Sequence, residues 1–122
     1  MSNKLACRRG DVFRGAVSVA GTPYSGECTG PVASLYLHHP ADNLVAYSSG
    51  RQGFELRRDQ NQCTADTVQQ ITWGDLSCQQ QTSCRLGNAV TWCDYDDTND
   101  YGPHSWPRGG GGLILDFFRT LR

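Results

Sequence analysis

The segment PVASLYLHH at residues 31–39 constrains the fold most, because it is an almost uninterrupted apolar run. A strand with one face in water alternates apolar and polar residues, and this segment does not alternate. Such a run suits a strand that is buried on both faces, as in a parallel sheet covered by helices. The sequence therefore predicts a buried strand over 31–39.

Weaker signals predict the elements on either side of this strand. We expect a short helix over 2–9 that Gly10 ends, and a mostly exposed helix from Ser48 onward that Gly50 and Gly53 weaken. The other expected elements are a strand within 16–20, a loop over 22–30, an edge strand within 68–76, a strand over 88–96, a glycine loop over 109–112 and an amphipathic helix from 113. Strands that alternate with helices indicate an α/β layer structure, in one domain over 1–122.

The charge pattern excludes two classes of partner. The formal net charge of the 122 residues is −1, and the charged residues form no basic stripe, which argues against binding to nucleic acid. No apolar run approaches the roughly 18 residues that a spanning helix needs, so we expect no membrane insertion.

Six cysteines indicate disulfides and an oxidising compartment, although the sequence does not fix their pairing. Zinc is the alternative, but no C-x-x-C or C-x-x-H pair is present, so we expect no metal and no other cofactor. The first residues, MSNKLACRRGD, contain no apolar signal region. We therefore expect an extracellular protein whose chain is the mature or truncated part of something longer.

Two polar residues are candidates for catalysis, because each follows an expected strand. Asp42 follows the 31–39 strand and His104 follows the 88–96 strand, the position that functional groups occupy in open α/β sheets. A carboxylate ahead of a histidine is the back half of the Ser–Asp–His order of α/β-hydrolases, but the chain has no G-x-S-x-G elbow. Taken alone, Asp42 could be a turn former and His104 a solvated loop residue, and His38 and His39 are competing histidines.

Together these segments resemble the C-terminal half of secreted feruloyl esterases and related polyhydroxybutyrate-depolymerase-like esterases. Residues 2–21 look like the helix and strand that follow the nucleophile elbow of that family. CTGPVASLYLHHPADNLVAYSSG at 28–50 is similar to its acid strand and loop, VTWCDYDD with PHSWP to its histidine strand and loop, and LILDFFRTLR to its closing helix.

The resemblance implies a truncated α/β-hydrolase, with a short, mostly parallel sheet, flanking helices and disulfides, in which Asp42 is the acid and His104 the base. The sequence departs from the family at three places. His39 stands where glycine is usual, the histidine loop DDTNDYGPHSWP is longer, and the elbow would fall before Met1. The serine and the oxyanion-hole loop of the family are therefore missing from this chain.

A missing serine costs such a triad about six orders of magnitude in turnover. Ser2 is the first candidate for a replacement nucleophile, because it is closest in sequence to the missing elbow, and Ser105 beside His104 is the second. A partner could supply the nucleophile instead. The missing strands should also expose a sheet edge, which predicts a homodimer or a domain-swapped oligomer. A Cys7–Cys28 disulfide from the first helix to the second strand would help the truncated domain to stay folded.

The expected function is hydrolysis of carboxylic esters of the feruloyl or short-acyl class, with a small ester or a feruloylated polysaccharide as substrate. Trp106 and Tyr101 beside the histidine loop are candidates for an aromatic substrate pocket, and Trp92 is more typical of a core residue. The alternative is a non-catalytic module of the same fold that binds carbohydrate or a partner. A small disulfide-rich protein of unrelated fold is a third interpretation.

Overall fold

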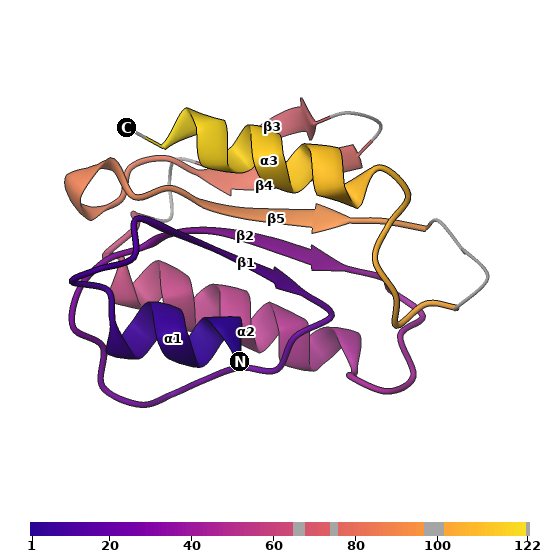
Figure 1. Cartoon of the computed structure of the whole chain (residues 1–122), viewed down its shortest axis with the longest axis horizontal. Helices are drawn as coiled ribbons and strands as arrows, with labels where there is room; N and C mark the ends of the chain where they lie inside the picture. Colours follow the sequence, from indigo (N-terminus) through magenta and orange to yellow (C-terminus); the bar gives the residue numbers. More distant parts are fainter. Residues whose placement is uncertain (65–67, 74–75, 97–101, 122) are drawn as a thin grey trace.

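The computed structural model describes residues 1–64, 68–73, 76–96 and 102–121. Its strands form a single five-stranded sheet in the order β1-β2-β5-β4-β3. The strands are β1 (Gly15–Val19), β2 (Ala33–His38), β3 (Val68–Trp73), β4 (Leu76–Gln81) and β5 (Val90–Asp94). The helices are α1 (Ser2–Arg8), α2 (Tyr47–Gln60) and α3 (Gly110–Thr120), with a short 3-10 turn η2 at Arg85–Gly87. Figure 1 shows α1 and α2 below the sheet and α3 above it, so the protein has the expected α/β layers.

The sheet is mixed, and the expectation of a mostly parallel sheet is wrong. Strands β1, β2 and β5 are parallel, whereas β4 is antiparallel to both β5 and β3. Only residues 74–75 separate β3 from β4. A connection of two residues can join only antiparallel strands, so the single edge strand expected within 68–76 is replaced by a hairpin over 68–81.

Strand β2 lies between β1 and β5, and each of its six residues is buried. Leu35 and Leu37 belong to the cluster that α3 covers with Leu113 and Phe117. Tyr36 belongs to the cluster on the opposite face, which contains Phe54 of α2 and which residues of β5 complete. The structure therefore confirms burial of this strand on both faces, as its apolar run predicts.

The two glycines of α2 have a different role from the one expected. Gly50 and Gly53 are buried and face the sheet. A Cβ at Gly50 would collide with the imidazole of His38, and a Cβ at Gly53 would lie 3.4 Å from the ring of Tyr36. The glycines cost helix propensity, but they allow α2 to pack closely on β2, so the interpretation of α2 as mostly exposed is corrected for this face.

The glycine run 109–112 is also corrected, because most of it is helical. Gly109 has a left-handed backbone (φ 69°), which glycine adopts without strain, and α3 begins at the next residue. The glycines then form the first turn of α3, since the helix is held to the sheet by Leu113 and Phe117. Packing of that apolar face outweighs the low helix propensity of glycine.

Three disulfides link the elements, as the cysteine content predicts: Cys7–Cys28, Cys63–Cys84 and Cys78–Cys93. The first ties α1 to the loop before β2 rather than to the strand itself. The third joins paired residues of β4 and β5. Three disulfides are compatible with an extracellular protein.

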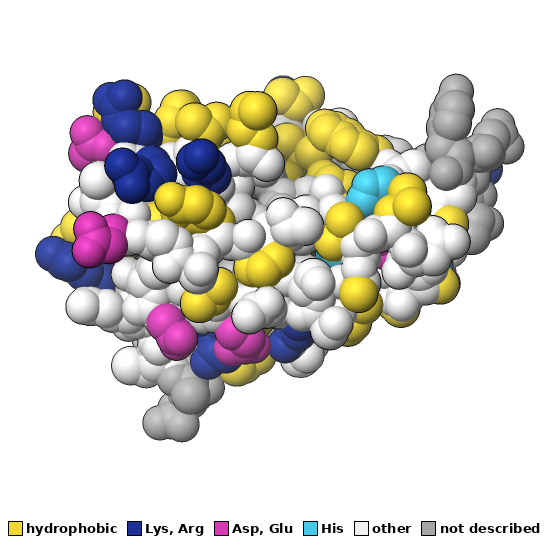
Figure 2. Space-filling model, turned by 90° about the horizontal axis from the view of Figure 1, so that it is seen from below, with side chains coloured by type: hydrophobic (Ala, Val, Ile, Leu, Met, Phe, Trp, Pro, Cys, Tyr) yellow, Lys and Arg dark blue, Asp and Glu magenta, His cyan; other side chains and the backbone are white. Residues whose placement is uncertain are grey.

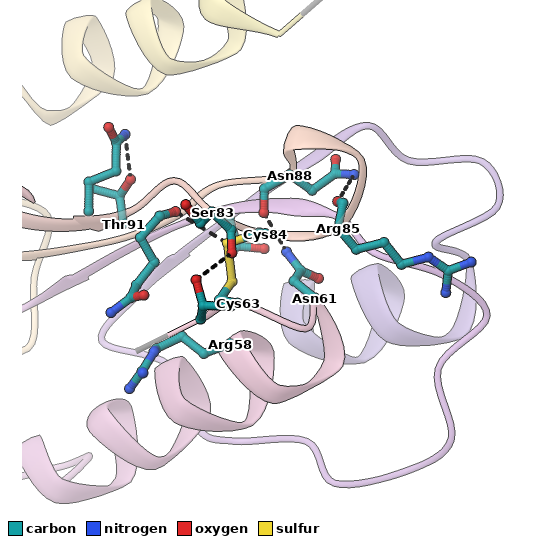
Figure 3. Close-up of a disulfide and its surroundings, with 12 residues drawn as sticks. Arg58, Asn61, Cys63, Ser83, Cys84, Arg85, Asn88 and Thr91 are labelled. Atoms are coloured by element: carbon teal, nitrogen blue, oxygen red, sulfur yellow. Dashed lines mark hydrogen bonds between the residues drawn. A yellow bond between two sulfur atoms is a disulfide. The ribbon is translucent and has the colours of Figure 1, made fainter. Parts of the chain in front are cut away.

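Figure 3 shows how the second disulfide lies beside a buried asparagine at the end of α2. The amide nitrogen of Asn61 donates to the carbonyls of Val32 (2.9 Å) and Asn88 (2.8 Å), and its oxygen accepts the Val32 N–H at 3.1 Å. The side chain is fully buried and fully bonded, so it fixes the entry to β2 against the end of α2. None of the described helices is long and apolar enough to cross a membrane.

Candidate active site

The structure brings Asp42 and His104 together at the carboxyl ends of adjacent parallel strands. Asp42 follows β2, and His104 lies in the segment between β5 and α3, 62 positions later. His104 Nδ1 lies 2.9 Å from Oδ2 and 3.1 Å from Oδ1 of Asp42. The two residues that the sequence singles out for catalysis therefore lie within hydrogen-bond distance in the fold, and their catalytic roles stay a prediction.

The carboxylate of Asp42 is buried and fixed by the loop that carries it. Its side chain has no exposed surface, and Oδ1 accepts the backbone N–H groups of Leu44 (2.9 Å) and Val45 (3.0 Å). Burial alone would raise the pKa of Asp42, but the hydrogen bonds from His104, Val45 and Leu44 outweigh it and hold that pKa below its usual value. Asp42 is therefore a fixed anion at neutral pH.

His38 lies behind this carboxylate at the end of β2. Its Nε2 is 2.9 Å from the carbonyl of Val45 and 3.4 Å from Oδ2 of Asp42. Both neighbours are acceptors, so Nε2 carries a proton and donates it. The ring is buried, stacked on Trp92 at 5.9 Å and in edge contact with Tyr47. His38 therefore fixes the 42–45 turn from inside the protein.

Tyr95, directly after β5, holds the loop that carries His104. Its buried hydroxyl donates to the carbonyl of Ser105 at 2.5 Å, and the carbonyl of Pro103 lies 3.5 Å away, so the contacts flank His104 on both sides. Burial, with a smaller contribution from the charge of Asp42, raises the pKa of Tyr95 to about 12. The hydroxyl therefore stays a neutral donor across the physiological range.

The imidazole of His104 is partly exposed and lines a cavity. The side chain is 36% exposed, in contrast to the buried Asp42. An ionised carboxylate only accepts hydrogen bonds, so Nδ1 carries the proton that is donated to Asp42, and in the neutral imidazole the lone pair is then on Nε2. A cavity of about 320 Å³ adjoins His104, and its walls come from the start of α1, the end of β1 and Val45.

One wall of this cavity has an unusual backbone. Ala20 follows β1 with φ 48°, in the left-handed region that non-glycine residues seldom adopt. It is buried, and its N–H donates to the carbonyl of Leu37 at 2.9 Å. Strained positions of this kind are found more often at functional sites, so Ala20 is a second feature that marks this end of the sheet.

The candidate nucleophiles are placed differently from each other. Ser2 is the first residue of α1 and lines the same cavity as His104, but no hydrogen bond joins the two residues in the described structure. The hydroxyl of Ser105 donates to the carbonyl of Gly102 at 2.6 Å, inside its own loop. Ser2 is therefore better placed than Ser105 to approach His104.

Of the two aromatic residues expected to bind substrate, only Trp106 lies among the described residues. Trp106 is 57% exposed and lines an apolar cavity that also includes Ser2. Tyr101 lies outside the described residues. Trp92 is buried, as expected for a core aromatic, and its indole N–H donates to Asp94 at 2.9 Å.

The competing histidines His38 and His39 do not reach this cavity. His39 is buried, its Nδ1 accepts the Ala41 N–H at 2.9 Å, and its ring lies in edge contact with Tyr95. Its Nε2 has no hydrogen-bond partner in the described structure. Among the described residues, no group of three or more His, Cys, Asp or Glu side chains is arranged to hold a metal ion.

Sequence reasoning missed the supporting roles of His38 and Tyr95. The signal for His38 was its position at the end of a run buried on both faces, four residues before Asp42. For Tyr95 no such signal exists, because its hydroxyl contacts the carbonyls of residues that follow 8 and 10 positions later, a spacing that no local pattern predicts.

Comparison of the chain with models of protein families and with curated protein sequences finds no match. The assignment of a function therefore rests on the geometry of the site.

Proposed function

We propose that this protein is a carboxylic-ester hydrolase in which His104 is the general base and Asp42 orients it. One observation carries the proposal: a buried carboxylate is bonded through both oxygens to Nδ1 of a partly exposed imidazole. This is the arrangement that leaves Nε2 available to take a proton from a nucleophile and stabilises the imidazolium that forms.

A structural ion pair is the simplest competing interpretation, and two features favour catalysis over it. Exposed ion pairs contribute little to stability, about 0–1 kcal/mol, whereas Asp42 is held by two backbone N–H groups and two imidazoles. Positioning of that kind fixes the direction of Nε2 rather than merely pairing charges. His104 also lines a cavity, which an ion pair does not require.

Ser2 is the candidate nucleophile within this chain. In the proposed reaction its hydroxyl oxygen attacks the ester carbonyl carbon while its proton passes to Nε2 of His104. The tetrahedral intermediate then breaks the bond to the alcohol, which leaves with the proton returned by His104. Water, activated by the same imidazole, hydrolyses the acyl-serine and restores Ser2. A nucleophile supplied by a partner would use His104 in the same way.

The proposed substrates are small esters of the short-acyl or feruloyl class, free or attached to polysaccharide. Support comes from the chemistry of the surroundings, because the cavity lined by Trp106 is otherwise largely apolar and also includes Ser2. An aromatic acyl group can pack on an exposed indole. An extracellular location is proposed with it, because plant-wall polysaccharides lie outside the cell and the disulfides suit that compartment.

Hydrolysis of p-nitrophenyl acetate and methyl ferulate by the purified, oxidised chain tests this function. We expect turnover above the buffer rate for the wild type, loss of turnover in Ser2→Ala, and no change in Ser48→Ala, which removes an exposed serine of α2. Turnover that is retained in Ser2→Ala would exclude Ser2 as nucleophile. No turnover in the wild type, alone or concentrated, would overturn the esterase proposal.

One observation favours a second candidate, a non-catalytic module that binds carbohydrate or a partner. Trp106 exposes more than half of its surface, and exposed indoles stack on sugar rings. Binding of xylan-derived oligosaccharides, measured as a change in tryptophan fluorescence that Trp106→Ala abolishes, would support this module if turnover is absent. An unchanged signal on addition of sugar would exclude it.

A further inference from the structure

Strand β1 has one free edge. It pairs with β2 on one side only and stands at the end of the described strand order. The Ala20 N–H donates to the carbonyl of Leu37 in β2. Backbone groups alternate in direction along a strand, so the N–H and C=O of Ser18 also face β2, and those of Val17 and Val19 face away from it. Within the described part of the chain, the outer edge of β1 therefore presents unpaired backbone donors and acceptors.

This edge lies in an apolar groove of about 550 Å³. One wall comes from Leu5 and Ala6 of α1, and the other from Ile114 and Phe118 of α3, so both faces of the sheet contribute. Phe13 and Trp106 extend the groove, and none of the described residues that line it is charged. Figure 2 shows hydrophobic side chains gathered along one margin of the molecule, reaching a histidine, with arginine or lysine grouped at one end.

The combination of apolar walls and an unpaired strand edge restricts what can fill the groove. Apolar walls favour an apolar occupant, but the backbone groups of Val17 and Val19 lose hydrogen bonds to water when they are covered. Only an occupant with its own row of backbone donors and acceptors satisfies both conditions. An extended polypeptide strand added to the sheet edge meets them.

We propose that the occupant is β1 of a second copy of this chain, paired antiparallel across a twofold axis. In that arrangement Val17 lies near its own counterpart, and the outward N–H and C=O groups of each copy bond the other. The axis places α1 against α1 and α3 against α3. The exposed Leu5 and Phe118 side chains, 45% and 42% exposed, then meet their counterparts on each face.

The charges of the molecule permit this self-association. The groove carries no charged side chain among its described residues, and the formal net charge of the chain is −1, so two copies repel each other little. The same surface therefore complements itself, which a twofold interface requires.

The proposed interface also borders the candidate active site. The groove shares Ser2 and Val19 with the cavity that His104 lines. The groove is also the apolar cavity in which the proposed acyl group would pack on Trp106, so a second copy that fills it competes with substrate for that surface and forms one wall beside the cavity that His104 lines. The proposal does not depend on ester hydrolysis, because the edge and the groove exist whether or not the site is catalytic.

Sedimentation velocity of the full oxidised chain, from about micromolar to millimolar concentration, tests the proposal. We expect a reversible species of twice the 13.4 kDa mass of one chain. Val17→Pro removes an outward N–H that β2 does not use, and proline is tolerated at such edge positions. It should weaken association at least tenfold, as should Phe118→Lys, whereas Leu44→Lys, an exposed apolar residue elsewhere, should not.

Hydrogen exchange supplies a test that needs no variant. The amides of Val17 and Val19 should exchange slowly in concentrated protein and quickly after dilution, with no such change for Ser18. A monomer at all concentrations would overturn the proposal. A dimer that is unaffected by Val17→Pro and Phe118→Lys, or one with fast exchange at Val17 and Val19, would place the interface elsewhere and overturn it equally.

Discussion

Two imidazoles flank the carboxylate of Asp42, and their surroundings differ sharply. The ring of His38 ends a central strand, is buried between aromatic rings, and has Nε2 committed to the carbonyl of Val45. The side chain of His104 lies between β5 and α3, is 36% exposed, and lines a cavity. The difference teaches that contact with a carboxylate does not define a catalytic histidine. What distinguishes His104, the proposed base, is a side chain that is partly exposed and lines a cavity.

The largest effect on stability is expected when the buried imidazole is removed. His38→Ala leaves a cavity beside Trp92 and Tyr47 and removes the donor to Val45, so it should lower the free energy of unfolding by about 3 kcal/mol. Urea denaturation measures this loss. Leu44→Ala, in the same loop but 74% exposed, is the control and should change stability by less than about 0.5 kcal/mol.

If His38→Ala were as stable as the control, His38 would not support the Asp42 turn. The structural role assigned here to His38, in contrast to His104, would then be wrong.

The charge of Asp42 predicts a smaller, pH-dependent effect. The pKa of Asp42 in the folded protein lies below the value of about 3.9 that aspartate has when unfolded. The unfolded chain therefore takes up the proton first as the pH falls. The resulting stabilisation is complete well above about pH 3.9 and is lost as the pH falls below it, through the folded-state pKa.

Urea denaturation of the wild type and of Asp42→Asn between about pH 6 and pH 2 measures this contribution. The stability difference between the two proteins should shrink as the solution becomes more acidic. A difference that is constant or grows towards low pH would show that the pKa of Asp42 is not lowered by folding.

A smaller effect again is expected at the loop that carries His104. Tyr95→Phe removes the hydroxyl that bonds the carbonyls on either side of the histidine, which should cost about 1 kcal/mol at neutral pH. Because folding raises the pKa of Tyr95 to about 12, wild-type stability also falls as the pH rises from about 10 towards 12. Tyr95→Phe has no hydroxyl to titrate, so it lacks this alkaline loss of stability.

Thermal unfolding of both proteins from about pH 8 to pH 11 checks these expectations. Equal stability at neutral pH, together with parallel alkaline losses, would mean that the tyrosine does not hold the loop.

The parts of the fold that the sequence predicted share one property, a strong local pattern. The continuous apolar run predicted β2 and its burial on both faces, and the strand expected over 88–96 corresponds to β5. Asp42 and His104 were each expected after the carboxyl end of one of these strands. The structure pairs the two strands as parallel neighbours and places His104 Nδ1 2.9 Å from Oδ2 of Asp42.

The parts that were missed depend on contacts between distant residues. The hairpin of β3 and β4 is rich in glutamine and lacks an alternating pattern, so only pairing with β5 reveals it. The glycines at 110–112 are helical because the residues after them pack on the sheet. Similarly, residue 50 is a glycine because the imidazole of His38 leaves no room for a Cβ beneath α2, and no local sequence pattern predicts that contact.

The measurement that tests the central claim most directly is kcat/KM for methyl ferulate in the wild type and in His104→Ala, both with their disulfides intact. The proposed general base predicts a fall to the uncatalysed rate in His104→Ala, with an unfolding free energy within about 1 kcal/mol of the wild type. Wild-type turnover in a correctly folded His104→Ala protein would contradict the assignment of His104 as the base.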